Sequence, residues 1–400
     1  AKLGNHSGGI DAKGYPGELT DDELEACLKF REELKIRDPA YREMVHAYAP
    51  AEEEAFALCR FLRARAFDVD AIFSMLEEND AATIWKEARD KNFYKEIEKL
   101  YNGCPLPVFM ALFPVVISGL AKNGATMFYF KPGNIDLNGL ECVASLPELI
   151  PFLWFVLHNG GKESMLQEAK TRDPKTTTVL SERIIVLDMK NISSSFLNTD
   201  FLKEAAKITA CFPETMNRTY MLNVPTAFTF VWAVVKLFLE PRTIQKIGFF
   251  SWESKAKQDL LNFVDSGELL SDYGGTGHSF DDVLKKRQQE HGPCSRYIAE
   301  TMAVSSRESH FSFDLTKGEK VSSVVIYSKG DSGAEISIRD SAGTVLIEPT
   351  TVKRKAGVDN AHYSVELDSS KLPNGEASFK VIATGAAKEY YLITVGVSTA

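Results

Sequence analysis

The sequence predicts a chain of three parts: an all-α unit, a central α/β domain and a C-terminal all-β sandwich. Apolar residues recur at helical spacing early in the chain, and apolar strand runs alternate with helix-like stretches in the middle. Short alternating runs separated by turn residues follow. We expect a flexible N-terminus at 1–19, the helical unit at 20–100, the α/β domain at 101–284, a linker at 285–307 and the sandwich at 308–400.

The helical unit opens with a capping signal. Thr20 and Glu23 have the spacing of a capping box, in which the hydroxyl and the carboxylate each bind a free backbone amide. Further helices are predicted after Pro50 and after Asp68. The apolar residues expected on or near one face of the first helix are Leu24, Cys27, Leu28 and Leu34.

The central region predicts a sheet that is buried on both faces, because its strands are continuous apolar runs. These strand runs are 126–130, 184–189, 220–224 and 247–250. The helix-like stretches around them are 146–158, 199–210, 226–239 and 253–264. Two uncharged segments, 104–121 and 219–235, approach the length of a membrane span. Proline residues interrupt both, so we expect buried strand and helix pieces instead.

Composition excludes several classes of function. The chain has 46 basic and 55 acidic residues, a net charge of -9, which argues against nucleic acid as a partner. The six cysteines are far apart, as expected for reduced thiols in a cytoplasmic protein. The sequence has no HExxH zinc motif and no GxSxG nucleophile elbow. We therefore expect no catalysis, no metal and no cofactor.

Two motifs, well separated along the chain, carry a family resemblance. The first runs from Arg60 to Val69 and reads RFLRARAFDV. The second begins with Phe212-Pro213-Glu214, and its later landmarks are Asn223, Pro225, Phe228, Trp232, Lys236, Thr243, Lys246 and the turn Tyr273-Gly274-Gly275. Together they resemble the CRAL-TRIO, or Sec14-like, lipid-binding family. The C-terminal strands resemble the GOLD domain that follows this lipid-binding domain in animal Sec14-like proteins.

The resemblance implies an α/β domain with an apolar cavity, closed by a helix that swings outward at a membrane. We call residues 226–239, which match this helix, the gate segment. The residues implied as cavity walls are Phe128, Phe130, Trp154, Phe155, Leu187 and Met221. The implied gate residues are Phe228, Val231, Trp232, Val235 and Phe238. Taken singly, each of the wall residues is more often ordinary core, whereas for the gate segment the resemblance favours a gate over core.

The resemblance also implies a head-group site in which cations neutralise a lipid phosphate. The matching residues are Arg65, Glu214, Thr243 and Lys246. An alternative role for the same residues is structural, with an Arg65–Glu214 salt bridge between the two domains and a solvated Lys246.

These expectations favour a soluble carrier that binds one hydrophobic ligand and transfers it between membranes or proteins. The ligand could be an isoprenoid such as a retinoid, tocopherol or squalene, or it could be phosphatidylinositol. The carrier would be cytoplasmic and would touch membranes transiently through the gate segment. The alternative is a lipid-sensing adaptor that recruits a protein partner through its β-sandwich. A carrier should move ligand between vesicles, whereas an adaptor should change its affinity for the protein partner with little transfer.

Overall fold

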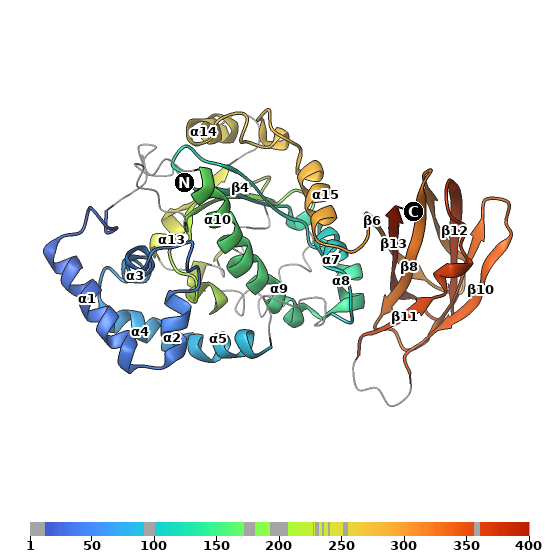
Figure 1. Ribbon diagram of the computed structural model, residues 1–400, viewed down its shortest axis with the longest axis horizontal. Helices are drawn as coiled ribbons and strands as arrows, with labels where there is room; N and C mark the ends of the chain where they lie inside the picture. Colours follow the sequence, from blue (N-terminus) through green and yellow to red (C-terminus); the bar gives the residue numbers. More distant parts are fainter. Residues whose placement is uncertain are drawn as a thin grey trace. The chain divides into compact units, whose positions relative to one another are not determined.

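The computed structural model describes residues 13–91, 101–171, 181–192, 207–226, 228, 232–233, 236–238, 241–250, 255–355 and 361–399 (Figure 1). The chain forms two compact units that interleave along the sequence. The first unit consists of residues 1–97, 115–133 and 150–283. The second consists of residues 98–114, 134–149 and 284–400. Within the described ranges, no helix is both long and apolar enough to cross a membrane.

The first unit begins with five helices: α1 (Asp21–Ile36), α2 (Pro39–Val45), α3 (Glu54–Arg63), α4 (Val69–Glu78) and α5 (Ala81–Asp90). The predicted capping box is confirmed, because Thr20 and Glu23 bind each other's backbone amides. The buried face of α1 differs from the expectation, since Leu24 and Leu28 are exposed while Phe30 is buried. Phe30 lies on the side of α1 that meets α3, where its ring contacts that of Phe61.

A five-stranded sheet forms the centre of this unit. Its strands are β1 (Val115–Leu120), β2 (Thr126–Phe130), β3 (Arg183–Asp188), β4 (Met216–Leu222) and β5 (Ile247–Phe250). They lie in the order β1-β2-β3-β4-β5, with β1 antiparallel to β2 and the other pairs parallel. The four predicted strand runs become β2 to β5. The proline-containing segment 104–121 supplies β1 and, before it, helix α7 (Leu106–Leu112).

Helical segments complete the first unit. They are η1 (Pro132–Asn134), α9 (Ile150–Phe155), the π-helical turn η3 (Val156–Gly160), α10 (Gly161–Thr171), η5 (Lys236–Phe238), α13 (Pro241–Gln245), α14 (Lys255–Phe263), η6 (Ser271–Tyr273) and the start of α15 (Phe280–Glu290). Helix α14 covers one face of the sheet, where Asp259 accepts hydrogen bonds from Tyr220 at 2.7 Å and Arg218 at 3.2 Å.

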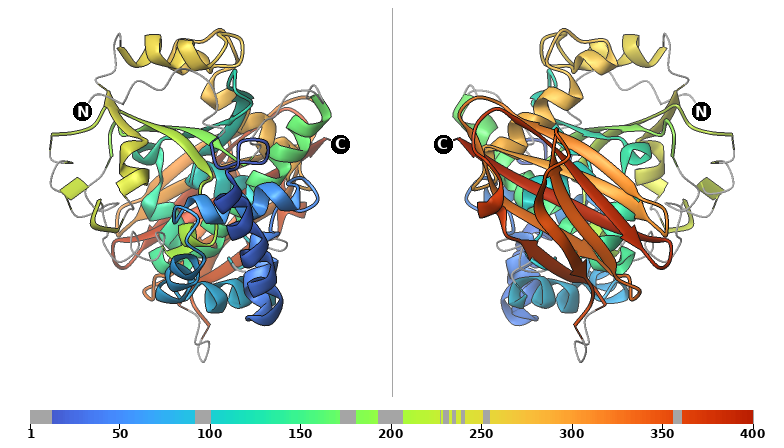
Figure 2. Two further views of the ribbon diagram at one scale, coloured as in Figure 1. Left: turned by 90° about the vertical axis from the view of Figure 1, so that its left-hand side faces the viewer. Right: turned by 90° about the vertical axis from the view of Figure 1, so that its right-hand side faces the viewer.

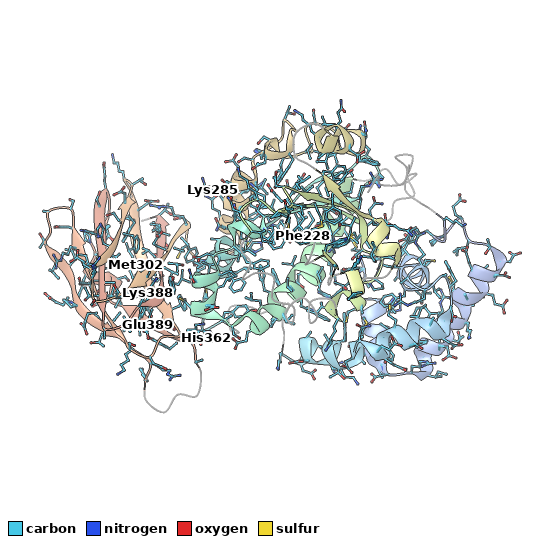
Figure 3. The ribbon with its side chains drawn as sticks, turned by 180° about the vertical axis from the view of Figure 1, so that it is seen from behind. Phe228, Lys285, Met302, His362, Lys388 and Glu389 are labelled. Atoms are coloured by element: carbon cyan, nitrogen blue, oxygen red, sulfur yellow. The ribbon has the colours of Figure 1, made fainter. Side chains whose placement is uncertain are left out.

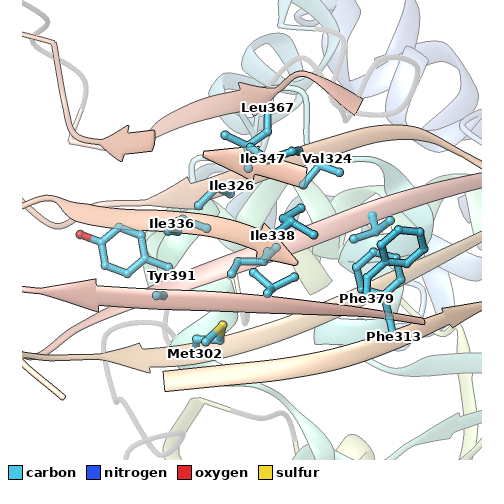
Figure 4. Packing of buried hydrophobic residues seen from close by; sticks show 14 of the residues in the cluster. Met302, Phe313, Val324, Ile326, Ile336, Ile338, Ile347, Leu367, Phe379 and Tyr391 are labelled. Carbon is cyan, nitrogen blue, oxygen red and sulfur yellow. The ribbon is translucent and has the colours of Figure 1, made fainter. Parts of the chain in front are cut away.

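The second unit is a two-sheet β-sandwich. Its strands are β6 (Arg296–Val304), β7 (Ser309–Leu315), β8 (Glu319–Ser328), β9 (Ala334–Asp340), β10 (Val345–Val352), β11 (Tyr363–Leu367), β12 (Ala377–Gly385) and β13 (Glu389–Thr399). One sheet has the order β10-β9-β12-β7 and the other β11-β8-β13-β6 (Figure 2, right). Buried aliphatic and aromatic side chains from both sheets fill the space between them (Figure 4).

Three helical segments from earlier in the chain belong to this sandwich unit: α7, α8 (Leu137–Val143) and η2 (Leu146–Leu149). Helix α8 packs on β8 and β13, and α7 packs on β6. Cys142 donates to the carbonyl of Tyr390 at 3.3 Å, and Tyr327 donates to that of Gly103 at 3.3 Å. The range 285–307, expected as a linker, holds the end of α15 and all of β6.

Candidate functional site

The two faces of the five-stranded sheet differ in exposure. One face buries Val116, Met127, Tyr129, Ile184, Val186, Tyr220 and Leu222, and only its edge residue Phe250 is partly exposed among the apolar residues of β2 to β5. The other face is equally apolar but partly exposed, and its partly exposed members are Val115, Ile117, Phe128, Phe130, Ile185, Leu187, Ile247 and Phe249. We call this second set the open face. The strand register places these residues in continuous rows across the sheet.

Two described residues of the gate segment, Phe228 and Trp232, lie over one end of the open face. Phe228 (labelled in Figure 3) and Trp232 pack in one apolar cluster with Leu187 and Met221. The Trp232 ring centroid is 5.0 Å from that of Phe249. The structure therefore brings together four predicted site residues from β3, β4 and the gate segment. Val231 and Val235 lie outside the described residues, as does the side chain of Phe238.

The gate segment also presents apolar surface outward. In η5, Leu237 is 75% exposed and Lys236 is exposed beside it.

The turn η3 passes over the open face at the opposite, amino end of the parallel strands. A β-carbon on Gly160 would lie 2.9 Å from the Cδ1 atom of Ile117, so η3 passes close to the open face here. Single π-helical turns inside helices are frequent at functional sites.

The two remaining predicted wall residues lie on α9. Trp154 is 1% exposed and packs against Trp85 and Phe212, with ring centroids 5.2 and 5.1 Å away. A side chain with so little accessible surface can support the site from behind but offers little contact to a ligand. Phe155 is partly exposed and stacks on Phe152. Phe128 and Phe130 both lie on the open face of β2.

Two of the predicted head-group residues meet directly. The Nζ atom of Lys246 lies 3.3 Å from Oε2 of Glu214 and donates to the carbonyl of Met216 at 2.9 Å, so this lysine is bound rather than solvated. Arg63 joins them, with its Nε atom 3.5 Å from the same carboxylate oxygen. Arg65 donates to the carbonyl of Ala64, and the carbonyl of Thr243 accepts from the Lys246 amide.

Sequence reasoning did not assign Arg63 to this site. The signal was present, because Arg63 stands one helical turn after Arg60 in the first motif. Both side chains are buried, and Arg60 is bound by Glu52, with an Nη2–Oε2 distance of 3.0 Å. The repeat of buried arginines at helical spacing indicates that α3 turns a charged face inward.

Further buried polar groups surround Glu214. Glu182 accepts hydrogen bonds from Asn217 at 2.6 Å and from Tyr15 at 3.5 Å. Burial raises the pKa of Glu182 and, more strongly, that of Tyr15. Glu214 itself has a φ of 53°, a left-handed conformation that is strained for a glutamate. Backbone strain of this kind is common at ligand-binding positions.

Comparison with known proteins gives two family matches. Residues 112–275 match the model of the CRAL/TRIO domain, and residues 25–78 match that of the CRAL/TRIO N-terminal domain. Both ranges end before the β-sandwich, so its likeness to the GOLD domain stays a prediction.

Curated relatives span the same region. "CRAL-TRIO domain-containing protein YKL091C" of Saccharomyces cerevisiae is 30% identical over 66% of this chain and 81% of that protein. "SEC14 cytosolic factor" of Yarrowia lipolytica is 26% identical over 66% of this chain, and the match spans half of that protein. "Phosphatidylinositol/phosphatidylcholine transfer protein SFH9" of Arabidopsis thaliana is 27% identical over 56% of this chain and 38% of its own length. The crystal structure of Sfh5 aligns with a TM-score of 0.40 at 16% identity, covering 68% of this chain and 99% of that one.

Proposed function

Because the chain belongs to the CRAL/TRIO family, we propose that it is a lipid carrier that holds one hydrophobic ligand on the open face of its five-stranded sheet. The gate segment would cover the ligand in transit and move aside at a membrane. The relatives named as phosphatidylinositol/phosphatidylcholine transfer proteins support a lipid cargo.

The observation that carries this proposal is the difference between the two faces of the sheet. A sheet covered by helices normally buries both faces, yet here eight apolar side chains of one face keep accessible surface. Burial of apolar surface contributes about 25 cal/mol per Å2, so an acyl or isoprenoid chain on this face would bind with few polar contacts. Phe228 and Trp232 would close over it, because they already pack on Met221 and Phe249.

The cluster of Arg63, Glu214 and Lys246 would hold the head group if the cargo is phosphatidylinositol. Arg63 and Lys246 supply two cations that a phosphate can engage, beside the buried carboxyl groups of Glu214 and Glu182. If the cargo is an isoprenoid, the same cluster is an internal salt bridge between α3 and the segment before β4.

The test is to incubate the full chain with phosphatidylcholine vesicles that contain phosphatidylinositol, recover the protein and identify its lipid by extraction and mass spectrometry. Ile185→Trp would fill the middle of the open face. We expect this variant to carry about tenfold less lipid than the wild type, and to transfer it between vesicles correspondingly more slowly.

Leu28→Trp is the matched control, because it adds the same bulk on the exposed side of α1. It should load lipid like the wild type. A wild-type chain that takes up no lipid from these vesicles, or an Ile185→Trp variant that loads normally, would contradict the proposal. Extracted phosphatidylinositol would assign the charged cluster to the head group.

A further inference from the structure

Two of the six cysteine side chains lie in contact, and both belong to the helical part of the first unit. The Sγ atoms of Cys27 on α1 and Cys59 on α3 are 3.8 Å apart, although 32 residues separate them in the chain. Both thiols are free, and Cys27 is 8% exposed while Cys59 is 1% exposed. Two thiols at van der Waals distance are a starting arrangement for a disulfide, which requires about 2 Å of further approach.

The packing of α1 on α3 keeps the two sulfur atoms together. The ring of Phe30, which follows Cys27 by three residues, lies with its centroid 6.3 Å from that of Phe61. Arg31, one turn after Cys27, pairs with Glu54 at 3.0 Å. An aromatic contact and an ion pair therefore join the two helices beside the cysteine pair, and rotation of the cysteine side chains can close the remaining gap.

The two thiols of this pair differ in reactivity. A hydrogen bond from Cys59 lowers the pKa of Cys27, whereas the same hydrogen bond together with burial raises the pKa of Cys59. Cys27 is also the more accessible of the two, so it meets an oxidant first and as the better nucleophile. By contrast, burial raises the pKa of Cys142 and of Cys211 to about 12, which makes those two thiols inert.

We propose that Cys27 and Cys59 form a redox-sensitive modification site, which a peroxide converts to a disulfide that clamps α1 to α3. The thiolate of Cys27 attacks a peroxide oxygen, so that a sulfur–oxygen bond forms and the oxygen–oxygen bond breaks. The hydroxide that leaves takes up the proton that Cys27 has released. The thiol of Cys59 then attacks the sulfenic sulfur, and the disulfide forms as a second water leaves with the proton of Cys59. In all, two thiols lose two electrons and two protons, and one hydrogen peroxide is reduced to two waters.

The disulfide would tie α1 to the helix that carries Arg60 and Arg63. A cross-link between residues far apart in the chain restricts the unfolded state, so the oxidised protein should be the more stable form. The effect on α1 should be large, because the outer side of this helix is open to solvent at Leu24 and Leu28. This modification goes beyond the proposed carrier function, since no lipid takes part in it.

The experiment treats the reduced full chain with hydrogen peroxide at neutral pH, blocks the remaining thiols with N-ethylmaleimide and maps the cysteines by tryptic digestion and mass spectrometry. Trypsin cleaves after Lys29 and after Arg60, so the two cysteines fall in separate peptides that only a disulfide joins. We expect this joined pair of peptides and the loss of two of the six thiols. The unfolding midpoint of the first unit should rise by about 5 °C and should return to its starting value with dithiothreitol.

Cys59→Ser should stop the reaction at the sulfenic acid of Cys27, which dimedone labels. Cys294→Ser is the matched control, because Cys294 is also 8% exposed but lies in the sandwich unit, and this variant should cross-link like the wild type. A wild-type chain that keeps all six thiols after peroxide treatment, or that joins other cysteines, would overturn the inference. A cross-link that leaves the unfolding midpoint unchanged would also overturn it, because the disulfide would then not act as a clamp.

Discussion

The β-sandwich and the five-stranded sheet use similar apolar side chains in opposite ways. In the sandwich, the inner faces of the two sheets pack against each other and are buried. Phe313 stacks there on Phe379, with ring centroids 4.9 Å apart. In the five-stranded sheet, α14 covers one face while Phe128, Ile185 and their neighbours keep accessible surface on the other. This difference supports our proposal that the first apolar surface serves stability and the second binds a ligand.

The largest difference between the two apolar surfaces is expected when one phenylalanine in each surface is truncated to alanine. Phe379→Ala removes a fully buried ring and should lower the free energy of unfolding of the sandwich unit by about 3–5 kcal/mol. Phe128→Ala removes a partly exposed ring and should cost less, about 1–2 kcal/mol, yet it should reduce lipid loading. Hydrogen exchange read by mass spectrometry follows β12 and β2 separately, which suits a chain of two units.

Equal destabilisation by the two substitutions would mean that the open face is ordinary core. Unchanged lipid loading in Phe128→Ala, together with small destabilisation, would mean that this end of the face does not contact the ligand.

A second difference concerns charge, since the helical part of the first unit buries an ion pair whereas the sandwich core is apolar. Glu52→Ala leaves the guanidinium of Arg60 buried and unpaired, because Arg60 is 0% exposed. We expect a loss of about 3 kcal/mol in the free energy of unfolding of the first unit. Thermal and urea denaturation followed by tryptophan fluorescence reports this loss, as Trp85 and Trp154 lie in that unit.

Glu54→Ala provides the control for this substitution. Glu54 pairs with Arg31 at 3.0 Å, but the two side chains are 50% and 40% exposed, so the change should cost less than about 1 kcal/mol. If the two variants were equally stable, the buried pair would contribute no more than a surface one.

The smallest effect on stability is expected for an ion pair at the edge of the sandwich. Two hydrogen bonds of 2.8 Å from Arg296 hold the pKa of Glu319 at about 2, below its ordinary value of 4.5. The stabilisation is therefore fully present above about pH 4.5 and is lost as the pH falls toward 2.

Arg296→Gln should lower the stability of the sandwich by about 0.5–1 kcal/mol at pH 7. The difference from the wild type should shrink steadily below pH 4.5 in denaturation curves recorded across the pH range. A difference that stays constant down to pH 2 would assign the loss to packing of the arginine stem rather than to charge.

The sequence predicted the elements whose signals are local. Thr20 and Glu23 form their capping box within one helical turn, and the apolar runs of β2 to β5 read as strands without tertiary context. Strand β1 was harder to place, because an apolar segment with prolines fits a strand or a helix equally well. Strand β6 was read as part of a linker, since Arg296, Glu300 and their polar neighbours hide its alternation.

The candidate site depends on contacts that no local pattern contains. Arg63 reaches Glu214 across about 150 residues of sequence. The exposure of α1 was misjudged for the same reason: Leu24 and Leu28 follow the periodicity of a buried face, but α3 packs beside Phe30. Both faces of the five-stranded sheet are apolar, so the sequence could not indicate which one stays open.

The interleaving of the two units has a consequence for synthesis on the ribosome. Helices α7 and α8 leave the exit tunnel early, but the strands on which they pack, from β6 to β13, follow much later in the chain. About 250 residues separate the end of α8 from the end of β13. Because translation proceeds at about 5–20 residues per second, the apolar sides of these helices stay uncovered for on the order of 10 to 50 seconds before the last partner strand is synthesised. During that interval they are natural clients for a chaperone, even though the finished protein buries them.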